Sequence, residues 1–475
     1  MNREVESFLI KVLANMLNQK LQSLFVALVM IAVVSGCSNG KEYPVASYVT
    51  GTLKVRAEVD STDTFEGFRI SVLTQTEGNV DTLGTAVTVT GGHFEMMVYA
   101  PDEGIYPIVV ERSGASLSLD DFVAVNGDTV QVSGTFPLGT RPLRVVSAEN
   151  AAWSAYKNSK ATHNDQMVTL LEAGGYTTDD IGRVNAQTAT ILWSIQNTYP
   201  STMGGAISMA ESVVMSEGWD DTVVLERYPQ VGYDNSSIVA VVRAARRSIA
   251  RVTGQDSAIA MLNRYLNLVP SEKEAEILSE KVMAFADSLQ TERAVATASQ
   301  LRMEYPESEW SSWASRATYD LENLQPGMAA PGWSLTSREG ELLDTAGMDG
   351  RFVILEFFDP AEQIFQNELR RRDELFGALG PNVFQVVSVS VEPDEDINEA
   401  LFDEDVHPGH FVWTSAGMQE QIVADFNIQL LPTRYLIDPN GVIIAKYTGP
   451  ALANLERDLI VIVGGLNDIA KRIQQ

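Results

Sequence analysis

Cysteine is almost absent from this chain, which contains one among 475 residues. A single cysteine excludes an intramolecular disulfide framework, a cysteine-rich zinc site and a redox cycle that needs two thiols. Basic residues are also scarce, because 34 Lys and Arg face 63 Asp and Glu and leave a net charge of −29. Phosphate backbones repel such a chain, so we expect no nucleic-acid partner. Four histidines leave little material for metal sites, and we expect neither a metal nor another cofactor.

The N-terminal region resembles a bacterial export signal. An apolar run of eleven residues extends from Leu24 to Val34 and follows Lys20. A bilayer core of about 30 Å needs about 20 apolar residues, so this run is typical of a signal peptide rather than a membrane span. The segment from Val34 to Cys37 (VSGC) resembles the bacterial lipobox. The resemblance implies that residues 1–36 are removed and that Cys37 carries the lipid.

Two alternatives stay open at this end of the chain. The two acidic and two basic residues before Met16 offset one another, and translation from Met16 would give a more conventional signal. Cys37 could also be an unmodified thiol beside an ordinary signal anchor. In the lipobox interpretation, residues 37–45 are a tether and the mature chain has no usable thiol, so the lipid alone holds it at the membrane.

Residues 46–145 are predicted to form an antiparallel β-domain, either a small sandwich or an open barrel. Apolar residues alternate with polar ones, as at Phe94, Met96 and Val98, which is the period of a half-buried strand. Asn126-Gly127 predicts a hairpin turn between the strands on its two sides. No catalytic constellation is evident in this region.

Residues 146–325 change to a helical period. Ser271 and Glu274 form a capping box, and apolar residues follow on one helix face. A helix followed by proline occurs before Pro270 and again before Pro306. This spacing of 36 residues is near the period of tetratricopeptide repeats. The signature residues are weak, so the pattern predicts helical hairpins and leaves a true repeat array open.

Residues 326–475 alternate strand and helix. Phe352 to Phe358 (FVILEFF) and Val383 to Val391 (VFQVVSVSV) are typical of buried parallel strands, and a helix is predicted between them. The segment Asp438-Pro-Asn-Gly441 predicts a β-turn between two further strands. The pattern indicates a C-terminal α/β domain.

This last region resembles the thioredoxin-like fold, in particular the TlpA/ResA-type and alkyl hydroperoxide reductase/thiol-specific antioxidant relatives. The resemblance rests on three motifs in order: GMAAP from Gly327, the FVILEFF strand, and LPTRYLIDPNG from Leu431. It implies that Pro432 is a cis-proline, within a loop of Leu431, Pro432 and Thr433 that faces the active site in relatives.

The sequence departs from the family where the family keeps its Cys-x-x-Cys motif. Glu362 and Phe365 stand at the two cysteine positions, and Glu368 keeps the family's glutamate. A carboxylate and a phenyl ring can neither attack a disulfide nor resolve a mixed disulfide. We therefore expect no catalytic residue here and a domain without redox activity.

Three other features admit a chemical and a structural interpretation. Glu362 could be a general acid or base, but a carboxylate in the first turn of a helix is also favoured by the helix dipole. His407 and His410 have a metal-like spacing, but the intervening Pro-Gly predicts a turn with two surface histidines. The acidic run 392–405 lacks the ligand order of a calcium-binding loop, and we expect a solvated helix start.

The whole layout resembles lipid-anchored envelope proteins of the Bacteroidetes. We expect such a protein to catalyse no reaction and to act as a scaffolding module that binds an envelope polypeptide. The expected binding groove is formed by Glu362, Phe365 and the cis-proline loop. The expected location is the outer membrane, facing the periplasm, and exposure on the cell surface stays open as the alternative. One alternative is a thiol-disulfide oxidoreductase or antioxidant activity, as the family would imply. A second is an adaptor that binds partners through the helical region.

Overall fold

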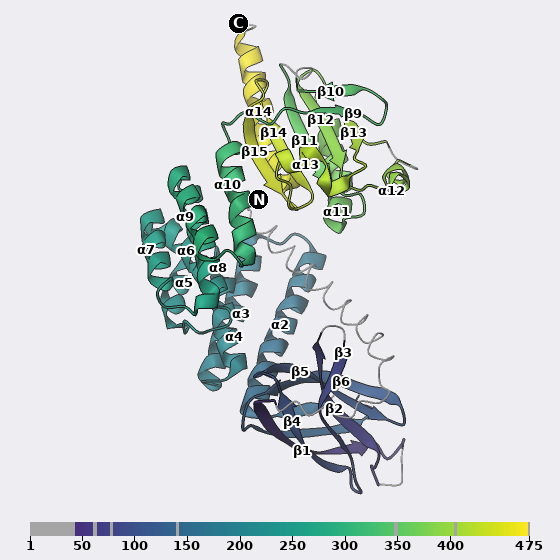
Figure 1. Cartoon of the computed structure of the whole chain (residues 1–475). Coiled ribbons are helices and arrows are strands. Elements are labelled where there is room, and N and C mark those ends of the chain that lie inside the picture. The colour runs from purple at the N-terminus through teal and green to yellow at the C-terminus, as the bar shows by residue number, and fades with distance from the viewer. Residues whose placement is uncertain are drawn as a thin grey trace. The chain divides into compact units, whose positions relative to one another are not determined.

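The computed structural model describes residues 43–59, 64–76, 79–138, 142–345, 350–402 and 406–473. These residues form two compact units. The first contains residues 43–258 together with 267–270, and the second contains 259–266 and 271–473. The predicted signal segment and Cys37 lie outside the described residues. Figure 1 labels the elements of both units.

The N-terminal part of the first unit is a sandwich of two four-stranded sheets, ordered β4-β1-β7-β8 and β3-β2-β5-β6. Side chains alternate along β4 between buried and exposed, because successive residues of a strand point to opposite faces of a sheet. The inward set from both sheets forms one core that includes Val49, Phe68 and Phe122. The strands are β1 (Val45–Val55), β2 (Phe68–Thr76), β3 (Asn79–Val87), β4 (His93–Ala100), β5 (Gly104–Arg112), β6 (Ala115–Ala124), β7 (Thr129–Phe136) and β8 (Arg144–Val146).

The hairpin predicted at Asn126-Gly127 is wrong. The strands on its two sides belong to different sheets, and β7 instead pairs in parallel with β1. The turn is fixed to β1, since the Gly127 amide donates to the Ala46 carbonyl at 2.8 Å and the Ala46 amide donates to Asn126 Oδ1 at 3.1 Å. These two bonds direct the chain across the sandwich, so that β1 and β7 form a parallel pair among the described strands.

Helices follow the sandwich within the same unit: α2 (Ala148–Ala173), α3 (Thr178–Thr198), α4 (Met203–Ser216), α5 (Asp221–Arg227) and α6 (Ile238–Thr253), with the short 3-10 helix η1 (Tyr228–Gln230). Buried Asn150 at the start of α2 exchanges two hydrogen bonds with the Val123 backbone of β6. The Trp153 indole donates to Asp121 at 2.8 Å, one turn further along. These bonds join the first helix to the sandwich.

The helical region is divided between the two units. Helix α7 (Gln255–Tyr265) crosses the boundary, and α8 (Ser271–Asp287), α9 (Thr291–Glu304) and α10 (Glu309–Asn323) belong to the second unit. Helix α9 packs against both α8 and α10, which is the helical-hairpin arrangement that the sequence predicts. The region 146–325 is therefore helical throughout but is not one compact body.

The second unit ends in a five-stranded sheet ordered β13-β12-β11-β14-β15. Strands β11, β12 and β13 are parallel, whereas β14 is antiparallel to β11 and β15 antiparallel to β14. The strands are β11 (Phe352–Phe358), β12 (Phe384–Ser390), β13 (His410–Trp413), β14 (Thr433–Ile437) and β15 (Ile443–Thr448), beside the small pair β9 (Ser334–Thr336) and β10 (Leu342–Asp344).

Helices cover both faces of this sheet. Phe376 of α11 and Leu455 of α14 pack with Ile354 on one face. Ile422 of α13 packs with Leu355 on the other face. The helices are α11 (Gln363–Gly377), α12 (Glu395–Ala400), α13 (Gln421–Asp425) and α14 (Leu452–Ile473), with the 3-10 helix η3 (Gly417–Gln419). This strand order and helix placement define a thioredoxin-like α/β domain.

No helix in the described ranges combines the length and the apolar character that a membrane span requires.

Candidate functional site

The site expected from the sequence lies where β11 ends and α11 begins. Glu362 is the N-cap of α11, and its Oε2 accepts hydrogen bonds from the backbone amides of Ile364 and Phe365, the latter at 3.3 Å. These amides would otherwise lack partners in the first turn of the helix. The Glu362 carboxylate therefore caps the helix, which is the structural one of its two sequence interpretations.

Phe365, at the second cysteine position, does not line a groove. Its side chain is fully buried and stacks on Phe358 with ring centroids 4.4 Å apart, in a cluster with Phe411. The apolar ring gains more from burial under α11 than from a place at the surface. The expectation that Phe365 lines the binding groove is wrong, because its side chain belongs to the domain core.

The loop before β14 has the third set of expected residues. The Leu431–Pro432 peptide bond is cis, Pro432 is buried, and Thr433 begins the strand. The Thr433 hydroxyl donates to the Leu430 carbonyl at 2.6 Å, and the Gly449 amide donates to the Pro432 carbonyl at 2.8 Å. The loop is thus held from both sides.

The same loop presents apolar and polar groups to the surface. The Leu430 side chain is 63% exposed, and Leu431 is half-buried. Among the residues that the structure describes, none hydrogen bonds to the backbone N–H or C=O of Leu431. An unpaired backbone beside an exposed leucine can pair with an extended peptide as a strand edge does.

Helix α10 braces the segment that leads into this loop. Asn427 has a φ of 45°, and its side-chain Nδ2 donates to the Arg316 carbonyl at 3.0 Å and to Asp320 Oδ1 at 2.8 Å. The Tyr319 hydroxyl donates to the Asp425 carbonyl at 3.0 Å. The last helix of the helical region therefore supports the cis-proline loop, a role that sequence reasoning missed.

A buried cluster of charges crosses the sheet beneath α11. Glu356 Oε2 accepts from Arg372 Nε at 2.7 Å and from Ser388 Oγ at 2.8 Å, and Oε1 accepts from Arg434 Nε at 2.8 Å. Burial alone would raise the pKa of Glu356, but Arg372 and Arg434 outweigh it and lower the pKa to about 2. Glu356 is therefore ionised and fully paired, which suits structure rather than proton transfer.

Glu368 extends the same cluster. Its Oε2 accepts from Arg434 Nη1 at 2.8 Å. Burial raises the pKa of Glu368, against the lowering effect of Arg434. The signal that could have revealed the cluster was present in the sequence, since Glu356 and Arg434 interrupt otherwise apolar strands.

The expectation of two surface histidines is wrong for His407, which is buried. Its Nδ1 lies 2.6 Å from Asp373 Oδ2 and its Nε2 lies 2.8 Å from the Leu401 carbonyl. His410 is partly exposed, with its Nδ1 3.3 Å from Glu341.

The acidic run 392–405 contains α12 and its N-cap Asp394, whose side chain accepts a hydrogen bond from the Asp396 backbone amide. Residues 403–405 of the run lie outside the described residues. Within the described ranges, no group of three His, Cys, Asp or Glu side chains is placed to hold a metal ion.

Comparisons with known proteins give structural neighbours only. No protein-family model matches the sequence, and no curated protein matches it. Similar solved structures include a candidate thiol:disulfide interchange protein DsbE from Chlorobium tepidum, with 20% identity and a TM-score of 0.27 over 29% of this chain and 98% of that chain. The thioredoxin domain of a thiol-disulfide oxidoreductase from Bacteroides vulgatus has 21% identity and a TM-score of 0.26 over 29% and 99%.

A thiol-disulfide oxidoreductase from Bacteroides fragilis has 27% identity and a TM-score of 0.25 over 28% of this chain and 98% of that chain. Each of these three matches covers less than a third of this chain. The assignment of the thioredoxin-like fold rests on the strand order and helix placement described above.

Proposed function

We propose that this protein is a lipid-anchored protein of the bacterial cell envelope, with a thioredoxin-like domain that binds extended polypeptides and has no redox activity. The observation that carries the proposal is the contrast around the expected active site. Glu362 and Phe365 are used to cap and pack α11, whereas the loop at Leu431 keeps an unpaired backbone and an exposed Leu430 among the described residues.

Thiol chemistry needs a thiolate, and the only cysteine of the chain is Cys37. Peptide binding needs a backbone edge and an apolar contact, and the loop offers both. The Bacteroidetes-type layout and the lipobox at Cys37 support an envelope location, with the outer membrane and its periplasmic face as the proposed site.

The binding test uses the full chain in detergent and a fluorescein-labelled, end-capped pentapeptide, Thr-Val-Thr-Val-Thr. We expect saturable anisotropy that Leu430→Asp weakens. Leu342→Asp is the matched control, because Leu342 is 66% exposed in the same domain but lies on β10. Equal binding by wild type and Leu430→Asp would contradict the proposed site.

The anchoring test compares wild type with Cys37→Ser in the expressing bacterium. We expect wild type in the membrane fraction and the variant in the soluble fraction, with the acyl mass present only on wild type. Membrane association of both chains without an acyl mass would contradict lipid anchoring at Cys37.

The family-level alternative, thiol-disulfide exchange or peroxide reduction, is decided by insulin-reduction and peroxide-consumption assays on the Cys37→Ser chain. We expect no turnover, because that chain has no thiol.

A further inference from the structure

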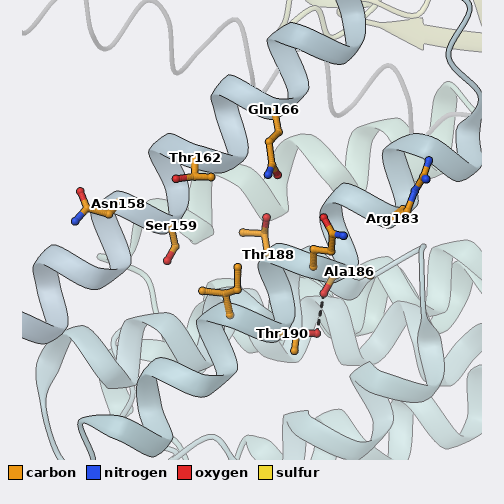
Figure 2. Close-up of a pocket in the computed structure, with 10 residues that line it drawn as sticks. Asn158, Ser159, Thr162, Gln166, Arg183, Ala186, Thr188 and Thr190 are labelled. Atoms are coloured by element: carbon orange, nitrogen blue, oxygen red, sulfur yellow. Dashed lines mark hydrogen bonds between the residues drawn. The ribbon is translucent and has the colours of Figure 1, made fainter.

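A cavity between α2 and α3 lies far along the chain from the cis-proline loop and within the other compact unit. It has a volume of about 610 Å³ and is lined by ten residues of these two helices. Figure 2 shows Ser159, Thr162 and Gln166 of α2 on one side of it and Thr188 of α3 on the other. This volume is in the range of small-ligand sites.

Four polar side chains of the lining are exposed to solvent and have no hydrogen-bond partner among the described residues. Ser159 and Thr190 donate to carbonyls of their own helices, each at 2.8 Å. In contrast, no described residue hydrogen bonds to the side chains of the other four, which are Asn158, Thr162, Gln166 and Gln187. Three of these four are carboxamides, and a carboxamide offers donors and an acceptor at once.

The charge of the lining argues against an ionic ligand. The ten lining residues include no carboxylate, and the one cation, Arg183, is paired with Asp180. An anionic polymer would also meet the net charge of −29. The lining contains no aromatic side chain, so it offers no platform on which a sugar ring or a nucleobase could stack.

The dimensions favour a short stretch of extended chain. The lining runs from residue 158 to 166 on α2 and from 183 to 191 on α3, which is about 12 Å of helix at 1.5 Å per residue. An extended polypeptide covers that length with about four residues at 3.3 Å each.

The base of the cavity is held together by a buried contact. Thr188 is buried, and its hydroxyl lies 3.0 Å from Nδ1 of buried His163 on α2. This contact connects the two helices below the carboxamides. The carboxamides can therefore bind a ligand without giving up a contact that joins α2 to α3.

We propose that this cavity is a second binding site, which takes about four residues of an uncharged, extended polypeptide through hydrogen bonds from the carboxamides to the peptide backbone. A peptide group presents one donor and one acceptor, as each carboxamide does, so the pairing needs no particular side chain on the ligand. The site does not depend on the thioredoxin-like domain. It gives the adaptor alternative a definite location.

The test titrates the full chain with a fluorescein-labelled, end-capped tetrapeptide, Ala-Thr-Gln-Ala, and follows anisotropy. The test variant is Gln166→Ala with Gln187→Ala, and the matched control is Gln300→Ala, a helical carboxamide outside the cavity that donates to Glu304. We expect the double variant to weaken binding by about tenfold, as the loss of two hydrogen bonds predicts, with the control unchanged.

Leu430→Asp separates this site from the cis-proline loop. Tetrapeptide binding that survives Leu430→Asp and falls in the double variant supports the cavity site, even if the loop binds nothing. The proposal is overturned if the double variant with unchanged thermal unfolding binds as wild type does, if no saturable binding occurs, or if maltotetraose binds there and the tetrapeptide does not.

Discussion

The α11 region of the thioredoxin-like domain and the cavity between α2 and α3 use polar side chains in opposite ways. Beneath α11, Glu356 is fully buried and each carboxylate oxygen has an arginine partner. At the cavity, Gln166 and Gln187 have no partner among the described residues. Paired polar groups stabilise a fold, and unpaired ones at a concave surface are free to bind. The difference predicts that substitutions in the first region change stability and substitutions in the second change binding.

The largest effect is expected for Glu356→Gln. Removal of this charge leaves Arg372 and Arg434 buried without their common partner, which should cost about 3–5 kcal/mol of unfolding free energy. Urea unfolding measures the loss. Glu339→Gln is the control, since the Glu339 side chain is 61% exposed, and should change stability by less than about 0.5 kcal/mol. Equal unfolding free energies of Glu356→Gln and Glu339→Gln would contradict the claim that the buried charges beneath α11 stabilise the fold.

His163, which contacts Thr188 at the base of the cavity, should contribute to stability as the buried cluster around Glu356 does. Burial lowers the pKa of His163 from its usual value to about 4, so the folded state favours the neutral ring. Stability is therefore present above the unfolded-state pKa of about 6.5 and is lost as pH falls from there to about 4, by up to about 3 kcal/mol. Urea unfolding between pH 7 and pH 4 measures this slope.

His163→Gln is the matched variant for that slope. It has no titrating group, so its stability should fall less over the same pH range than that of wild type. An unchanged slope would show that His163 does not supply the pH dependence.

A smaller effect is expected at the helix cap. Glu362→Ala removes the acceptor for two amides of α11 and should cost about 1 kcal/mol, while Glu362→Asp should retain most of the cap. The neighbouring Gln363→Ala serves as the control for propensity alone. If Glu362→Ala left the free energy of unfolding unchanged but abolished a catalytic activity of the protein, Glu362 would act as a general acid or base rather than as a helix cap.

The smallest effect on stability is expected at the cavity rim. Gln166→Ala with Gln187→Ala removes no hydrogen bond between described residues, and alanine favours helices, so thermal unfolding should shift by less than a few degrees. A large loss of stability would show that these carboxamides have structural partners.

The sequence predicts the order of strands and helices in the C-terminal domain because long apolar runs such as FVILEFF identify buried strands directly. The cis bond before Pro432 is what the resemblance of the LPTRYLIDPNG segment to the thioredoxin-like family implies, and the structure has it. Residue-level roles are harder to predict, because they depend on contacts between distant segments. Phe365 packs in the core against Phe358 and Phe411. His407 is held in the interior, where it contacts Asp373, a residue 34 positions away in the sequence.

The β-domain shows the same limit for topology. Asn126-Gly127 has the residue types of a hairpin turn. However, both residues hydrogen bond to Ala46, which lies 80 residues before Asn126, and these bonds direct the next strand to the other sheet. Turn residues predict that the chain turns, and the pairing of β7 with β1 decides where it goes. The cavity between α2 and α3 has no sequence signal, since its polar residues resemble those of any solvated helix face.

The most direct test of the central claim is the anisotropy titration of Thr-Val-Thr-Val-Thr with the Cys37→Ser chain, which contains no thiol. A thioredoxin-like domain that binds polypeptide without redox chemistry should give the same affinity as the chain with its cysteine, and Leu430→Asp should reduce that affinity. Loss of binding in the Cys37→Ser chain, or binding that is insensitive to Leu430→Asp, would contradict the account.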